Sequence, residues 1–115
     1  MGDMQICSWN AQALMATHKE KSRAKWAHCW RLLQHYDILA LQETHSTVAN
    51  TTRVITPPGR QIWWSHETQH TGGVGLIITQ TFLRNFQSND DGTIGDWLEV
   101  VPGRAAILRL EGTPR

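Results

Sequence analysis

The sequence has 115 residues, a formal net charge of +1 and a hydrophobic content of 40%, which together suit one small globular domain. No apolar stretch is long enough to cross a membrane, and the N-terminus lacks the regions of a secretory signal, so an intracellular protein without a membrane partner is expected. The near-neutral net charge argues neither for nor against nucleic acid, so the distribution of charge matters more than its sum.

The first forty residues have the pattern of a strand, a helix and a second strand. Alternating side chains predict a strand from Met4 to Asn10. Apolar side chains then recur at helical spacing and predict a helix over residues 19–35, with one face formed by Trp26, Cys29, Trp30 and Leu33. The apolar run from Ile38 to Leu41 predicts a strand covered on both faces. This order predicts a βαβ unit with two parallel strands.

The rest of the chain predicts four strands, one helical turn and several loops. The strands are expected over residues 61–66, 74–79, 97–101 and 104–110, and the helical turn over 81–86. Residues 44–60 and 87–95 carry the composition of loops. The two cysteines, Cys7 and Cys29, fall in apolar segments and are expected to be reduced thiols of the core.

Asn10 and Glu43 follow the two strands of the βαβ unit, where ligands bind in open α/β sheets. Because the C-terminal ends of parallel strands share one edge, the two side chains are expected to lie side by side. A carboxylate and a carboxamide there are suitable ligands for Mg²⁺, which takes few protein oxygens and keeps its waters. The alternatives are a surface acid that caps nearby backbone and a turn residue that satisfies its own backbone.

A basic stretch opens the predicted helix, where Glu20 is the one acidic residue. Its cations, which would contact phosphates of a nucleic acid, are Lys19, Lys21, Arg23 and Lys25. The alternative is a solvated helix start. His45 has the chemistry to bind phosphate or to act as an acid or base, or it is a polar surface residue. Trp63 and Trp64 are candidates for base stacking, although neighbours on a strand point to opposite faces, so at least one belongs to the core.

The glycine-rich segment TGGVGLII, residues 71–78, is not a phosphate-binding loop. No Lys-Ser or Lys-Thr follows its glycines, no third glycine stands at dinucleotide spacing, and a strand rather than a helix is expected after them. A turn before the strand is the expected structure.

Four segments, taken in order, resemble the endonuclease/exonuclease/phosphatase superfamily. They are ICSWNAQAL, DILALQETH, TGGVGLIIT and GRAAILRLEG, at residues 6–14, 37–45, 71–79 and 103–112. The sequence is most similar to the apurinic-endonuclease-like domain of non-LTR retrotransposons. The resemblance implies a four-layer α/β sandwich of two packed sheets flanked by helices. It also implies hydrolysis of phosphoesters with a divalent metal, usually Mg²⁺, with Mn²⁺ as a substitute.

The resemblance also implies residue roles, and the sequence departs from the family at three of them. Glu43 takes the place of a metal ligand, and Asn10 that of a residue in the active-site hydrogen-bond network. Gln12 stands where apurinic endonucleases carry an acid. The family's Asp-x-Asn pair and its terminal Ser-Asp-His motif do not occur in the sequence.

We therefore expect the fold to be a partial four-layer α/β sandwich that begins with a βαβ unit. Residues 1–115 are expected to form the N-terminal part of an endonuclease/exonuclease/phosphatase domain that is truncated at its C-terminus, inactive alone, with DNA as the partner of the intact domain. The exposed sheet edge is expected to bind a protein partner or to aggregate. The alternatives are a phosphoester phosphatase and a non-catalytic remnant that binds nucleic acid or a partner. A retrotransposon origin would allow a nuclear location.

Overall fold

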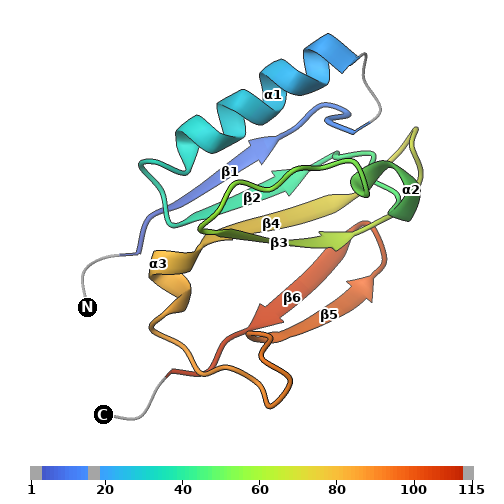
Figure 1. The fold of residues 1–115 in the computed structure, drawn as a ribbon. Coiled ribbons are helices and arrows are strands. Elements are labelled where there is room, and N and C mark those ends of the chain that lie inside the picture. The colour runs from blue at the N-terminus through green and yellow to red at the C-terminus, as the bar shows by residue number, and fades with distance from the viewer. Residues whose placement is uncertain (1–3, 16–18, 113–115) are drawn as a thin grey trace.

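The computed structural model describes residues 4–15 and 19–112, which fold as mixed α/β around two sheets (Figure 1). The strands are β1 (Ile6–Asn10), β2 (Ile38–Gln42), β3 (Arg60–Ser65), β4 (Val74–Thr79), β5 (Asp96–Val101) and β6 (Ala105–Arg109). The helices are α1 (Lys19–Leu32), α2 (Val48–Thr51) and α3 (Gln80–Leu83). The predicted α/β class is confirmed, and every predicted strand is present with its ends moved by no more than a few residues.

The predicted βαβ unit is confirmed by the pairing of β1 with β2. These strands are parallel, with Ile6 opposite Ile38 and Asn10 opposite Gln42. β2 also pairs with β4, which runs antiparallel to it and to β3, so the first sheet has the order β1-β2-β4-β3. β2 is thus an inner strand, which agrees with its continuous apolar run.

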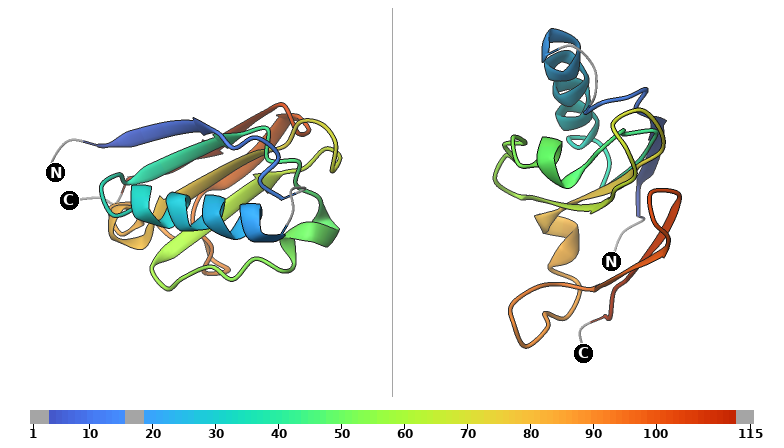
Figure 2. Two further views of the ribbon diagram at one scale, coloured as in Figure 1. Left: turned by 90° about the horizontal axis from the view of Figure 1, so that it is seen from above. Right: turned by 90° about the vertical axis from the view of Figure 1, so that its right-hand side faces the viewer.

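The helix α1 covers one face of the four-stranded sheet (Figure 2). Cys29 and Leu33 pack there against Leu39, Leu41 and Ile77 of the sheet. The helix ends at Leu32 rather than at the predicted His35. A turn continues it to Tyr36, whose N–H bonds to the Leu32 carbonyl, because the chain must reverse there to enter β2.

The second sheet, β5 paired antiparallel with β6, lies on the opposite face of the first sheet (Figure 2). The apolar cluster between the sheets contains Ile38, Ile78, Leu83 and Leu108. The described residues therefore form three layers: a helix, a four-stranded sheet and a two-stranded sheet. α3 begins one residue earlier than predicted and contributes Phe82 and Leu83 to this second core.

The predicted loop over residues 44–60 contains the short helix α2, which no sequence pattern had indicated. Thr47 caps it: its Oγ1 accepts a hydrogen bond from Asn50 N at 3.0 Å, and Asn50 Oδ1 accepts one from Thr47 N at 2.7 Å. This reciprocal capping box stabilises a helix too short to show apolar periodicity. None of the helices within residues 4–15 and 19–112 is long and apolar enough to span a membrane.

Both cysteines are free thiols, as predicted. Cys29 is buried and Cys7 is half-buried, and both belong to the core beneath α1. Burial raises the pKa of the Cys29 thiol to about 12, so this group stays protonated at neutral pH and serves packing rather than chemistry.

Candidate functional site

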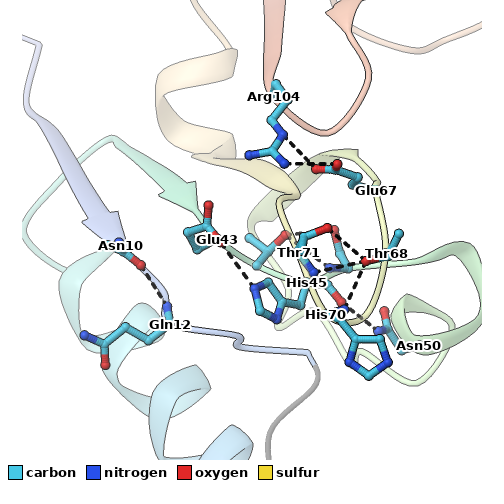
Figure 3. Close-up of polar contacts among 12 residues, drawn as sticks. Asn10, Gln12, Glu43, His45, Asn50, Glu67, Thr68, His70, Thr71 and Arg104 are labelled. Atoms are coloured by element: carbon cyan, nitrogen blue, oxygen red, sulfur yellow. Dashed lines mark hydrogen bonds and ion pairs between the residues drawn. The ribbon is translucent and has the colours of Figure 1, made fainter.

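The edge of the sheet at the C-terminal ends of β1 and β2 brings Asn10 and Glu43 together (Figure 3). Asn10 is the last residue of β1 and pairs with Gln42, so Glu43 follows one residue beyond its neighbour. Asn10 is exposed, and 44% of the Glu43 side chain is accessible to solvent. The two strand ends lie side by side, as predicted, and both residues can be reached from solution.

The backbone at this edge is strained. Among the described residues, four that are not glycine have a positive φ, and they are Gln12 (47°), Ala13 (64°), Glu43 (53°) and His45 (52°). All four lie in the two loops that follow β1 and β2. A non-glycine residue in this region costs of order 1–3 kcal/mol and persists only where its surroundings hold it. The strain therefore indicates that the surrounding fold fixes the direction of the side chains at this edge.

Hydrogen bonds between the two loops hold that conformation. Ala13 N bonds to the Glu43 carbonyl at 2.7 Å, and Met15 N bonds to the Thr44 carbonyl at 2.9 Å. These bonds continue the parallel pairing of β1 and β2 past the ends of the strands. The Glu43 backbone is thereby fixed from the β1 side.

The segment before β4 holds the same loop from its other side. Thr44 N bonds to the Gly73 carbonyl at 3.1 Å, and Gly73 N bonds to the Gly103 carbonyl at 2.8 Å. A β-carbon on Gly73 would lie 2.4 Å from Thr44 Oγ1, so no larger residue fits there. The predicted turn at the glycine motif is confirmed, and its contact with the Glu43 loop was not foreseen.

The polar side chains at this edge form hydrogen bonds with neighbouring groups of the same edge. Asn10 Oδ1 accepts a hydrogen bond from Gln12 N at 3.0 Å. Glu43 Oε2 lies 3.2 Å from His45 Nε2 (Figure 3), and 17% of the His45 side chain is exposed. Asn50 of α2, which was not among the predicted site residues, donates from Nδ2 to the His45 carbonyl at 3.0 Å. His45 is therefore placed as a direct partner of Glu43.

As a metal site this edge offers a single carboxylate. No cluster of three or more His, Cys, Asp or Glu side chains suited to a metal ion occurs within residues 4–15 and 19–112. Mg²⁺ is commonly bound through one or two carboxylates, with waters and substrate phosphate completing its shell. The half-exposed Glu43 fits that role in part, and the Asn10 amide adds at most one further oxygen.

The predicted basic residues of α1 divide into two groups. Lys19 and Arg23 line a cavity beside α2, and Lys21 is exposed elsewhere on the helix. The Lys25 ammonium donates a hydrogen bond to the Gln12 carbonyl, so this residue supports the loop after β1. Its charge remains beside the edge that carries Asn10.

The predicted tryptophan pair on β3 belongs to the interior. Trp63 packs against the core between the sheets. Trp64 meets Trp26 of α1 edge to face, with ring centroids 6.0 Å apart, and its carbonyl accepts a hydrogen bond from Trp97 Nε1 at 3.0 Å. Both rings are half-buried and used in packing, as are Trp26 and Trp30 of α1.

Comparison with known proteins found no matching protein-family model. It also found no curated protein with significant sequence similarity.

Proposed function

We propose that this chain supplies the N-terminal part of a Mg²⁺-dependent phosphodiesterase domain of the endonuclease/exonuclease/phosphatase type, acting on DNA. The observation that carries the proposal is the strained edge at β1 and β2, where a carboxamide and a half-exposed carboxylate stand at the ends of adjacent parallel strands. The three layers are consistent with part of a four-layer sandwich. That the intact domain has a fourth layer is part of this proposal.

Glu43 would bind the metal, and Asn10 would orient groups at the same edge. The metal, with Mn²⁺ as a substitute, would supply a Lewis acid at the phosphate and lower the pKa of a bound water. His45 contacts the Glu43 carboxylate at 3.2 Å and restrains its direction. The bonds from Ala13 and Gly73 hold the backbone on either side of Glu43, so the carboxylate is positioned before any ligand arrives.

The residues present do not complete a hydrolytic site. Metal-assisted hydrolysis also needs an oriented nucleophile and charge stabilisation at the phosphate. The sequence has no Asp-x-Asn pair and no Ser-Asp-His motif that would supply them. We therefore expect this chain to bind the metal weakly and not to cleave DNA on its own.

Metal binding tests this proposal directly. We expect Mn²⁺, measured by water-proton relaxation, to bind weakly to the protein and not measurably to Glu43→Gln. Glu111→Gln is the matched control, because it removes the same charge from an exposed residue outside the edge. Equal binding by both variants would remove Glu43 from the site and with it the proposal.

Cleavage provides the second measurement. Supercoiled plasmid incubated with the protein and Mg²⁺ should remain intact, because the groups beyond Glu43 and Asn10 are not supplied. Nicking by the protein that disappears in Glu43→Ala would show a complete site, and it would contradict the expected inactivity while supporting the role of Glu43.

A further inference from the structure

A cavity of about 590 Å³ opens between α1 and the segment that includes α2. Its lining includes Trp26 and Trp30 with the cations Lys19, Arg23 and Arg53, and Asn50 of α2. Figure 2 shows the first turns of α1 beside α2. A volume of this size falls within the range of sites that bind small ligands such as a nucleotide.

Two stacked tryptophans form one wall of the cavity. The ring centroids of Trp26 and Trp30 are 5.0 Å apart, and their planes differ by 24°. The edge of Trp26 also rests on Trp64 of β3, at 6.0 Å and 78°. The pair is therefore held against the sheet, and each ring is only half-buried. A flat, pre-positioned aromatic surface of this kind stacks on nucleobases regardless of their sequence.

The charged groups around this wall are cationic. Lys19, Arg23 and Arg53 are exposed residues of the lining. No Asp or Glu occurs among the described residues that line the cavity. Three cations around an aromatic surface complement a base that carries phosphates on either side.

The cavity lies next to the edge that carries Glu43. Asn50 lines the cavity and donates a hydrogen bond to the carbonyl of His45, whose ring contacts Glu43 (Figure 3). Met15 also lines the cavity, and its N–H bonds to the Thr44 carbonyl at 2.9 Å. The cavity and the Glu43 loop therefore share two supporting residues, Asn50 and Met15.

We propose that this cavity binds single-stranded nucleic acid. One base stacks on the Trp26–Trp30 pair, and the flanking phosphates contact Lys19, Arg23 and Arg53. This site is separate from the Glu43 carboxylate and requires no metal. It adds Arg53 and the two tryptophans of α1 to the surface that the basic residues of the sequence suggested.

Titration of the protein with a fluorescent oligothymidylate in metal-free buffer tests the proposal. We expect anisotropy to report binding that weakens with salt, and tryptophan fluorescence to fall as a base stacks. The double variant Arg23→Glu/Arg53→Glu should bind at least about tenfold more weakly, with a salt slope lower by roughly 0.7 for each phosphate that the protein no longer neutralises. The double variant Arg31→Glu/Arg84→Glu makes the same total charge change at two exposed positions outside the cavity, and it should bind within about twofold of the wild type.

The aromatic wall is tested separately. Trp30→Leu should weaken binding by roughly tenfold, the low end of the loss expected for one stacked base, and Trp30→Phe should recover much of it. Thermal melting of each variant identifies any loss of folding, and the two arginine reversals at exposed positions provide a test that does not depend on the core.

Three results would overturn the proposal. They are absence of binding at low salt, an Arg31→Glu/Arg84→Glu defect equal to that of Arg23→Glu/Arg53→Glu, and full affinity in a folded Trp30→Leu. The last would identify a site for simple polyanions, such as a lipid headgroup, which vesicles of anionic phospholipid would then occupy. The titration contains no metal and measures no cleavage, so its failure would not contradict the role proposed for Glu43. In the same way, a failure of the metal-binding experiment would not contradict the nucleic-acid site proposed here.

Discussion

The two sheets of this protein differ in how completely they bury their apolar side chains. Leu39 and Ile77 of the four-stranded sheet are 0% exposed, because both lie on the face that α1 covers. In the two-stranded sheet, Leu98 of β5 is 60% exposed and its cross-strand partner Ile107 of β6 is 54% exposed. The first sheet is covered by α1 on one face and, over β2, β4 and β3, by the second sheet on the other, whereas the second sheet is covered on one face only.

The open face of the second sheet is therefore the surface where we expect a protein partner or self-association. It is defined by the exposed residues Leu98, Val101 and Ile107. Met4 and Ile6, at the β1 side of the first sheet, are also more than half exposed. A surface of this composition is unusual on a monomer and commonly marks an interface.

The largest expected effect is the difference in lost stability when the same substitution is made in each of the two sheets. Leu39→Ala should lower the free energy of unfolding by about 2–5 kcal/mol, because it leaves a cavity between α1 and the sheet. Leu98→Ala, the same change on the open face, should stay within about 0.5 kcal/mol. Chemical denaturation of both variants measures the difference. Equal losses would mean that the second sheet is as fully packed as the first.

The second comparison is between a glycine that contacts the Glu43 loop and a glycine in the turn that leads into β5. Gly73 and Gly92 have nearly the same φ, 87° and 86°. Alanine at either position should cost about 1–2 kcal/mol for the left-handed backbone. Gly73→Ala should cost about 1–3 kcal/mol more, because its new β-carbon would meet Thr44 Oγ1.

Nothing lies within 4 Å of the corresponding position at Gly92. Denaturation curves for the two alanine variants therefore isolate the contact with the Glu43 loop from the cost of the backbone conformation. If the two variants were equally stable, the loop would be free to move away from Gly73, and the Glu43 backbone would not be rigidly held.

A charge placed on the open face should change association and leave stability nearly unaltered. Leu98→Lys is expected to keep the free energy of unfolding within about 0.5 kcal/mol and to reduce self-association. Light scattering over a range of protein concentrations measures this. Thr81→Lys adds the same charge at an exposed position of α3 and should have no such effect. A Leu98→Lys protein that associates like the wild type would exclude this face as the contact.

The smallest expected effect concerns pH and the half-buried His66, which stacks on Trp64. Burial lowers the pKa of His66 below its ordinary value of 6.5, and the nearby Glu99 opposes this shift. As pH falls through 6.5, the unfolded chain binds a proton that the folded protein resists, so stability decreases until the lowered pKa is passed.

Glutamine does not titrate, so the His66→Gln variant should lack this pH-dependent change in stability. The difference in melting temperature between wild type and His66→Gln should therefore be constant above about pH 8 and change as the pH falls from there to about 5. A difference independent of pH would show that His66 titrates in the folded protein as it does in the unfolded chain.

Local patterns in the sequence were sufficient for the elements that periodicity describes. The apolar run of β2 and the helical face of α1 predicted the βαβ unit, and the parallel pairing then placed Asn10 beside Glu43. The ends of these elements were less accurate. α1 stops at Leu32 because the turn into β2 requires it, and α2 depends on a capping pair that carries no apolar repeat.

The candidate site shows the same division. Residue type and strand position were enough to select Asn10 and Glu43, whereas Asn50, Arg53 and the cavity beside Trp26 and Trp30 were not found. These groups come from α1 and from the segment that contains α2 and Arg53, which lie apart in the sequence and meet only in the folded protein.

By itself, the sequence determined which segments form the six strands, α1 and α3, and which polar residues end the parallel strands. Those properties follow from the spacing of side chains along a few neighbouring residues. Only the tertiary structure decided that Gly73 holds the Glu43 loop, that Lys25 supports the loop after β1, and that the second sheet keeps one face open. Each of these depends on contacts between residues far apart in the chain, which local periodicity does not encode.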